Sequence, residues 1–152
     1  MKHTQQIKRK SVATMQRDHD LTLAFGRVRN RNRGKGLTFQ RLVEQTLEGP
    51  APCYYVDPEY ALRVLSRLRR GGKVTGPALR RQMWEELHRR ALAVMERYGL
   101  ERYSDGVYRV LWAGGASRFF ISQSTAEQVL REVRSDKANR ANRADRTDRE
   151  FK

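Results

Sequence analysis

The stretch Pro50-Ala51-Pro52-Cys53-Tyr54-Tyr55-Val56 decides how the first half of this chain is organised. Its prolines disfavour helix, and its aromatic and β-branched residues favour an extended backbone. Asp57-Pro58-Glu59 follows directly, with a capping carboxylate, a proline at the first helical position and an acid in the first turn. That combination predicts the start of a helix. We therefore expect a short strand followed by a helix.

The same order recurs in the second half of the chain. Aligning Gly49 with Gly114 places Tyr54-Tyr55-Val56 on Phe119-Phe120-Ile121 without a gap. Apolar spacing predicts two helices before each extended run and one after it. The expected fold class is mainly α with two short strands (α+β), built by internal tandem duplication of a helix-helix-strand-helix unit. Its two strands could pair about a pseudo-twofold axis. Two independent units are the alternative, but each would have a marginal core.

Composition divides the chain into five parts. We expect a flexible basic N-terminus over residues 1–10, a first repeat over 11–70, a glycine-rich linker over 71–76, a second repeat over 77–134 and a charged tail over 135–152. Residues 138–149 repeat Ala-Asn-Arg and related triplets, with no apolar residue larger than alanine. Arginines three residues apart drift by about 60° around a helix, so they would not share one face. The sequence predicts a disordered tail.

The balance of charge indicates a polyanionic partner. The chain has 32 Lys and Arg against 17 Asp and Glu, a net charge of +15. A surplus of this size repels itself when no partner is present, and DNA or RNA is the commonest such partner. An anionic membrane, an acidic protein or no polyanion at all are the alternatives. Residues 1–37 hold ten basic and two acidic side chains, so the excess is concentrated there.

The densest basic feature runs from Arg27 to Gly36, with no acid and with five cations in the nine residues from Arg27 to Lys35. An extended backbone would place all five cations on one side, where they could follow phosphates, while the asparagines could reach sugars or base edges. Arginine suits this task because its planar group contacts phosphate bidentately. A solvated helix end is the alternative interpretation. The candidate residues are Arg27, Arg29, Asn30, Arg31, Asn32, Arg33 and Lys35.

Two further sets of arginines lie on predicted helices. One set falls at i, i+4 and i+7 of the third helix, and the other projects from the outer side of the long fourth helix. Ordinary surface ion pairs would also explain the second set. The paired aromatics at 54–55 and 119–120 could stack on unpaired bases, but core packing is the preferred interpretation. The arginine candidates are Arg63, Arg67 and Arg70, with Arg80, Arg81, Arg89 and Arg90.

No arrangement in the sequence indicates catalysis, a metal site or a cofactor. Asp18-His19-Asp20 cannot converge on one ion, because consecutive helical residues point about 100° apart, and an exposed polar turn is expected there. Cys53 is the only cysteine, which excludes an intrachain disulfide and fits a reducing cytosol. Neither a secretory signal nor a membrane span is evident, so we expect a cytoplasmic protein with no membrane partner.

The pattern Pro50-Ala51-Pro52-x-Tyr54-Tyr55-Val56-x-Pro58-Glu59-x-Ala61, with its degenerate copy near Phe119, resembles a motif in small uncharacterised basic repeat-containing proteins of bacterial mobile elements. The resemblance implies a nucleic-acid accessory role. We therefore expect a non-enzymatic accessory or architectural protein that contacts the phosphate backbone of DNA or RNA. The alternatives are a protein-interaction subunit of a larger nucleic-acid-processing enzyme, such as a reverse transcriptase or recombinase, and a sequence-specific repressor, for which no reading helix is evident.

Overall fold

The computed structural model describes residues 10–150 and the side chains of residues 10–144, so the predicted basic N-terminus lies outside the described residues except for Lys10. Side chains of Ser11, Thr38 and Asp57 accept backbone hydrogen bonds at the starts of the first three helices. The helix start predicted at Asp57 is confirmed. The described residues form six helices: α1 (Val12–Arg31), α2 (Phe39–Glu48), α3 (Pro58–Arg69), α4 (Ala78–Tyr98), α5 (Tyr103–Ala113) and α6 (Gln123–Glu150).

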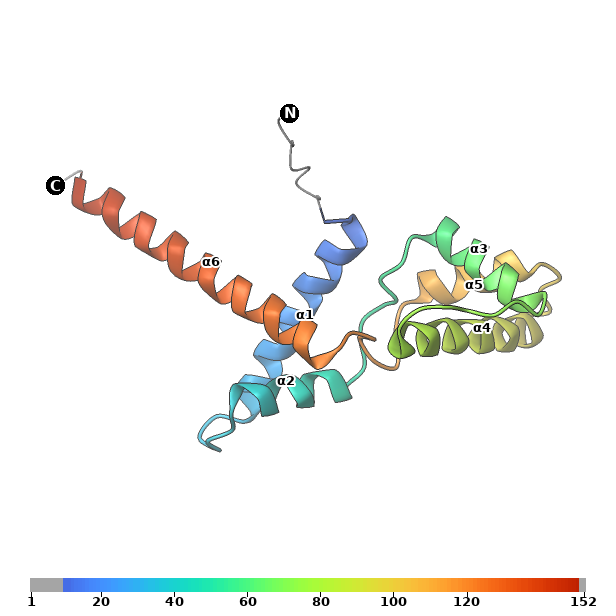
Figure 1. The fold of residues 1–152 in the computed structure, drawn as a ribbon, viewed down its shortest axis with the longest axis horizontal. Coiled ribbons are helices and arrows are strands. Elements are labelled where there is room, and N and C mark those ends of the chain that lie inside the picture. Colours follow the sequence, from blue (N-terminus) through green and yellow to red (C-terminus); the bar gives the residue numbers. More distant parts are fainter. Residues whose placement is uncertain (1–9, 151–152) are drawn as a thin grey trace, which may run out of the picture.

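The six helices form two lobes that exchange their third members (Figure 1). Helices α1 and α2 pack against α6, whereas α4 and α5 pack against α3. The third helix of each half of the chain therefore completes the lobe of the other half. Because an apolar helix face must be covered by another element, neither half of the chain can complete its core alone. The largest fully buried side chains come from both lobes, among them Leu21, Val43, Leu65, Trp84 and Leu87.

Two extended segments, residues 49–57 and 114–122, cross between the lobes. The predicted fold class with two short strands is wrong, because the described residues contain no strand and only one isolated antiparallel bridge. Ala51 and Ala116 exchange both backbone hydrogen bonds, with N···O distances of 3.0 and 2.9 Å. The bridge stays isolated, because no ladder continues from it on either side within the described residues.

Stacked rings hold the crossing instead of a ladder. Tyr54 stacks on Phe120 and Tyr55 on Phe119, with ring centroids 6.3 and 6.0 Å apart. The pairing is reciprocal, because the ungapped alignment of the two halves matches Tyr54 with Phe119 and Tyr55 with Phe120. Tyr54 and Phe119 are also buried, so they are not accessible to bases. Core packing, the preferred interpretation of these aromatics, is what the structure contains.

The two halves differ in the connection between their first two helices. Residues 32–38, seven in number, join α1 to α2, whereas only the four residues 99–102 join α4 to α5. Consequently, the ungapped alignment of the two halves holds around the crossing but is out by one position at the starts of α2 and α5, Phe39 and Tyr103. The longer connection contains Arg33-Gly34-Lys35-Gly36. The fold therefore does not need this basic loop to join two helices.

Helix α6 extends well past α1 and away from the body of the molecule (Figure 1). The sequence predicts disorder over residues 135–152, whereas the helix continues to Glu150 in the structure. Alanine and arginine have high helix propensity, and a helix nucleated in a packed lobe adds further turns at little cost. Asp136 also precedes Arg140 by four residues, a spacing that stabilises helices. All side chains over residues 134–144 are exposed.

Candidate nucleic-acid interface

A groove of about 430 Å³ lies between α1, α6 and the start of α2. Its floor is apolar, with side chains from all three helices. Four cations line it, two from α1 and two from α6, and no acid does. We call it the basic groove. The floor residues are Phe25, Phe39, Leu130 and Val133, and the cations are Arg27, Arg29, Arg134 and Lys137.

Helix geometry explains why cations and apolar side chains meet here. Phe25 turns toward the core of the lobe, and Arg27 and Arg29, which lie about 200° apart on α1, flank the exposed side of the same helix. On α6, Leu130 is buried, and Arg134 follows it by one turn. The guanidinium groups of Arg131 and Arg134 lie 5.4 and 5.6 Å from the ring centroid of Phe39. Such stacking orients a guanidinium and leaves its N–H groups for a ligand.

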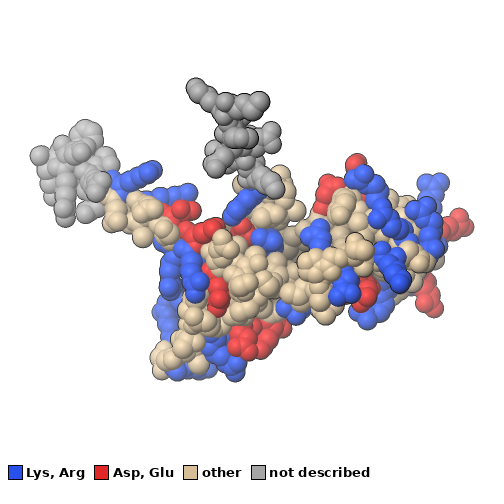
Figure 2. All heavy atoms as spheres, viewed as in Figure 1, with Lys and Arg blue, Asp and Glu red and all other residues tan. Residues whose placement is uncertain are grey.

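The charge of the groove is not balanced by neighbouring carboxylates. Within residues 10–144, ion pairs join Lys10 to Asp18 and Glu132, Arg17 to Asp18, and Arg41 to Glu44, and none includes a cation of the basic groove. Figure 2 shows Lys and Arg side chains along the outer edge of the lobe that contains α1, α2 and α6. Like charges around a concave surface with an apolar floor reinforce one another's field, which attracts anions.

The basic run from Arg27 to Lys35 does not have the extended conformation that the sequence analysis assumed. Its first half belongs to α1, which continues to Arg31. On this helix Arg27 and Arg31 share a face, but Arg29 points away from them. Of the five cations, only Arg27 and Arg29 line the basic groove. Gly34 and Gly36 adopt positive φ angles, so the chain turns sharply where Arg33 and Lys35 lie exposed.

The two asparagines of the run differ in role, since Asn32 joins two helices whereas Asn30 lines the basic groove. Asn32 Nδ2 donates to the carbonyl oxygen of Val28 at 2.7 Å and to Oε1 of Gln45 at 3.0 Å, which ties the end of α1 to α2. Asn30 Oδ1 accepts a hydrogen bond of 3.1 Å from Arg33. The bond to Gln45 occupies the amide of Asn32, so a role for this residue in base contacts is not supported by its geometry.

The remaining predicted arginines lie in the other lobe, on α3 and α4. Arg90 is half-buried and donates to Tyr54 Oη at 2.8 Å and to the carbonyl oxygen of Gly115 at 2.6 Å, so it stabilises the crossing. Arg63 and Arg80 stack over the rings of Tyr60 and Trp84. The structure does not bring this set together with the basic groove. The other members, all exposed, are Arg67, Arg70, Arg81 and Arg89.

Sequence reasoning missed the contribution of α6. Arg131, Arg134 and Lys137 are spaced three residues apart beside the apolar Leu130 and Val133. The sequence predicts a repeat that ends at Arg134 and a disordered tail that includes Lys137. The exchange of third helices brings α6 beside α1, and no local pattern in the sequence encodes that exchange. The sequence signal for this contribution is that cations lie next to buried positions of the last helix.

The candidate cluster Asp18-His19-Asp20 has a structural role. Asp18 and Asp20 are buried, not on the exposed turn that was expected. Asp18 pairs with Lys10 and Arg17. Asp20 accepts hydrogen bonds from Gln16 at 3.0 Å and from the Tyr55 hydroxyl at 2.7 Å. Within residues 10–144, no group of three His, Cys, Asp or Glu side chains is arranged to hold a metal ion.

Cys53 lies beside this polar cluster at the crossing. Burial raises the pKa of its thiol, a hydrogen bond with Tyr55 acts in the opposite direction, and the charge of Asp20 raises the pKa further. A raised pKa leaves little thiolate at neutral pH. The surroundings of Cys53 therefore disfavour nucleophilic reactivity.

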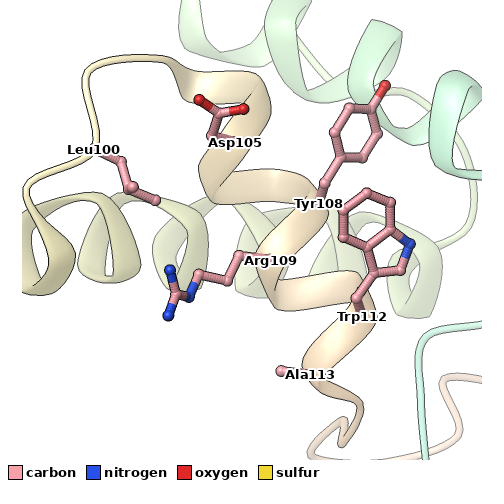
Figure 3. A pocket seen from close by; sticks show the side chains of 6 residues that line it. All are labelled: Leu100, Asp105, Tyr108, Arg109, Trp112 and Ala113. Atoms are coloured by element: carbon pink, nitrogen blue, oxygen red, sulfur yellow. The ribbon is translucent and has the colours of Figure 1, made fainter.

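A second surface feature lies on α5, around a hollow of about 550 Å³ (Figure 3). Tyr108 and Trp112 project from the same side of the helix and stack on each other, with ring centroids 5.4 Å apart. Trp112 is 76% exposed. The lining has two charged side chains, Asp105 and Arg109, and their opposite charges cancel. This aromatic surface therefore lacks the excess charge of the basic groove.

The matching order of helices in the two halves provides an internal comparison for the aromatic surface. Aligning the first residues of α2 and α5 places Glu44 and Glu48 of one lobe at the positions of Tyr108 and Trp112 in the other. Both glutamates are exposed, and Glu44 pairs with Arg41 at 3.1 Å. The same helix position is thus charged in one lobe and aromatic in the other. The fold does not require the aromatic pair.

Compared with models of known protein families, with curated proteins and with solved structures, the chain shows no significant match. Among the helices over residues 10–150, none has an apolar stretch long enough to cross a membrane.

Proposed function

We propose that this protein is a non-enzymatic nucleic-acid-binding protein, with an accessory or architectural role, that holds a phosphate backbone in the basic groove. The observation that carries the proposal is the gathering of four cations around one groove without an acid among its lining residues. Phosphate contacts dominate the affinity of such proteins and need no catalytic group. The carboxylates Asp18 and Asp20 support this choice, since both already have partners within the fold.

The arrangement of the groove suits a strand of phosphates better than a single small anion. Arg27 and Arg29 come from one wall, and Arg134 and Lys137 from the opposite wall. A backbone lying between α1 and α6 would meet cations on both sides. The exposed loop cations Arg33 and Lys35 follow α1 in the same lobe, where they extend the positive surface beyond the groove.

Two variants with equal loss of charge test the proposal. The groove variant carries Arg27→Ala, Arg29→Ala, Arg134→Ala and Lys137→Ala. The control variant carries Arg63→Ala, Arg67→Ala, Arg81→Ala and Arg89→Ala, all exposed positions of the other lobe. Fluorescence anisotropy with labelled mixed-sequence duplex DNA, duplex RNA and single strands measures the dissociation constants.

We expect the groove variant to bind about a hundredfold more weakly, at roughly 0.7 kcal/mol for each exposed ion contact. The control variant should lose much less affinity. Equal losses in both variants would mean that binding depends on net charge alone. A wild-type protein that binds no nucleic acid at low salt would refute the proposal altogether.

The aromatic surface favours one second candidate, a subunit that joins a nucleic-acid-processing enzyme to its substrate. Tryptophan, tyrosine and arginine are enriched among the residues that dominate protein interfaces, and Tyr108, Trp112 and Arg109 meet here. Replacing the pair by the residues of the other lobe, Tyr108→Glu with Trp112→Glu, should preserve the fold. After nuclease treatment, a true enzyme partner should remain attached to the wild-type protein and be lost from this variant.

A further inference from the structure

The exposed half of α6, residues 135–150, contributes no side chain to either core over its described part. Every side chain from residue 134 to residue 144 is exposed, although the helix is continuous from Gln123 to Glu150. At 1.5 Å per residue, this half extends for roughly 24 Å. Figure 1 shows it projecting from the lobe of α1 and α2 into solvent. A helix that is polar on all sides needs an explanation other than packing within the chain.

The side chains of this half have an ordered arrangement around the helix. Ser135, Asn139 and Asn142 fall at i, i+4 and i+7, so these three hydrogen-bonding residues form one stripe. At about 100° per residue, Arg134 projects on one side of that stripe, and Arg140 projects on the other side together with Asp136, which precedes it by four residues. Alanines at positions 138, 141 and 144 keep the helix slender between the polar side chains. Polar side chains that can bond to base edges therefore lie between two cations.

These dimensions and this chemistry match the major groove of duplex DNA. A helix with its side chains is about 10–12 Å across, and the major groove is about 12 Å wide. Asparagine can bond bidentately to the edge of adenine in that groove, and arginine reaches phosphates at its borders. The corresponding groove of A-form RNA is too narrow for a helix to read.

We infer that the exposed half of α6 enters the major groove of duplex DNA, with the stripe of Ser135, Asn139 and Asn142 toward the base edges. The inference rests on the proposed function and names its substrate. Arg134 and Lys137 line the basic groove and also begin this half of the helix. A phosphate backbone held in the groove therefore lies where the helix leaves the body of the protein.

A charge-neutral substitution tests the inference in the full chain. Ala141→Pro breaks the exposed helix, because proline removes a helical hydrogen bond and clashes with the preceding turn. It changes neither the charge nor a core residue. Ala141→Ser is the matched control, since serine stays compatible with a helix. The probes are mixed-sequence duplex DNA, duplex RNA of the same sequence and the single strand, and urea unfolding checks that the body of the protein is intact.

We expect Ala141→Pro to weaken binding to duplex DNA about tenfold and to leave binding to duplex RNA and the single strand unchanged, while Ala141→Ser behaves as the wild type. Selection from a randomised duplex pool should give a sequence preference that Asn139→Ala with Asn142→Ala abolishes. If Ala141→Pro binds DNA as tightly as the wild type, the helical form of residues 135–150 does not contribute to binding and the inference fails. That result would not contradict the proposed function, because the groove variant tests phosphate binding in the basic groove separately.

Discussion

Arg90 and Arg27 carry the same charge in different surroundings. Arg90 is half-buried and donates to Tyr54 and to the backbone of Gly115, so its charge stabilises the crossing. Arg27 is exposed at the edge of a groove without a carboxylate partner within residues 10–144. The sequence presents both as arginines on predicted helices, and only tertiary contacts separate them. Removal of Arg90 should affect folding, and removal of Arg27 should affect binding.

Asn32 gives a prediction of the same kind. Its amide joins Val28 to Gln45, so Asn32→Ala should lower the free energy of unfolding by about 1–2 kcal/mol, because two hydrogen bonds are lost. Asn30→Ala is the control, because its exposed side chain bonds only to the exposed Arg33 and should cost little. Urea unfolding of both variants measures the difference. A larger loss in Asn30→Ala than in Asn32→Ala would contradict the structural role of Asn32.

Glu86 predicts a pH dependence. Burial acts to raise the pKa of Glu86, but hydrogen bonds from Ser117 and Tyr54 and the charge of Arg90 outweigh it, so the pKa lies below the ordinary value of 4.5. A carboxyl group with a lowered pKa in the folded state contributes stability above the unfolded value and loses it as the pH falls through the folded value.

Glu86→Gln should therefore be less stable than the wild type at pH 7, and the gap should narrow as the pH falls below about 4.5. Urea unfolding at a series of pH values measures the gap. The exposed neighbour Glu85 supplies the control Glu85→Gln, which removes the same charge from the exposed side of the same helix. A gap that stays constant down to acid pH would rule out the proposed environment of Glu86.

Single helices show how far sequence reasoning reaches in this chain. The capping residue Asp57 predicted a helix start because a cap acts on the backbone next to it. The predicted strands are absent because Tyr54-Tyr55-Val56 favours an extended chain locally, whereas strand pairing depends on partners that are distant in the sequence. The lack of apolar residues in the tail hid its continuity with a packed helix. Helix and strand propensities describe a segment alone and do not include the structure of the segment that precedes it.

Two helical glycines test the packing of the helices against each other. A Cβ atom at Gly106 of α5 would lie 2.7 Å from Met95 Cγ and 2.9 Å from the carbonyl oxygen of Ala91, both on α4. Gly106→Ala should therefore destabilise the protein by about 1–3 kcal/mol. Gly26 of α1 has no atom within 4 Å of such a Cβ, so Gly26→Ala should stabilise by about 0.5–1 kcal/mol. Thermal unfolding of Gly106→Ala and Gly26→Ala gives the sign of each stability change. Two changes of the same sign would contradict the close approach of α4 and α5.

The two halves of the chain are held together by the exchange of their third helices, α3 and α6. The basic groove depends on this exchange, because α1 belongs to one half of the chain and α6 to the other. Periodicity predicted which faces are apolar, but not which half covers them, since either pairing would bury the same residues. The groove could therefore not be predicted from the sequence, although Arg27 and Arg29 were identified. The insertion of Arg33-Gly34-Lys35-Gly36 in one half adds charge to the lobe that already carries the groove.

The exchange predicts that the two halves assemble when made as separate chains, residues 1–72 and 73–152. The chain's two tryptophans, Trp84 and Trp112, both belong to the second half, and Trp84 packs against Tyr60 of the first with ring centroids 6.1 Å apart. Adding the first half to the second should therefore shift the emission of Trp84 to shorter wavelength and give a one-to-one complex with cooperative unfolding. Halves that fold separately and do not associate would disprove the exchange.

The salt dependence of binding tests the central claim most directly, because each phosphate neutralised on duplex DNA steepens log K against log salt by about 0.9. If all four cations of the basic groove contact phosphate, the groove variant should have a slope flatter than that of the wild type by about 3 to 4 units. The control variant should keep the wild-type slope, and both results should hold for unrelated DNA sequences. A groove variant with the wild-type slope, beside a control variant with a flattened one, would place the phosphates on the lobe of α3 and α4 and contradict the claim.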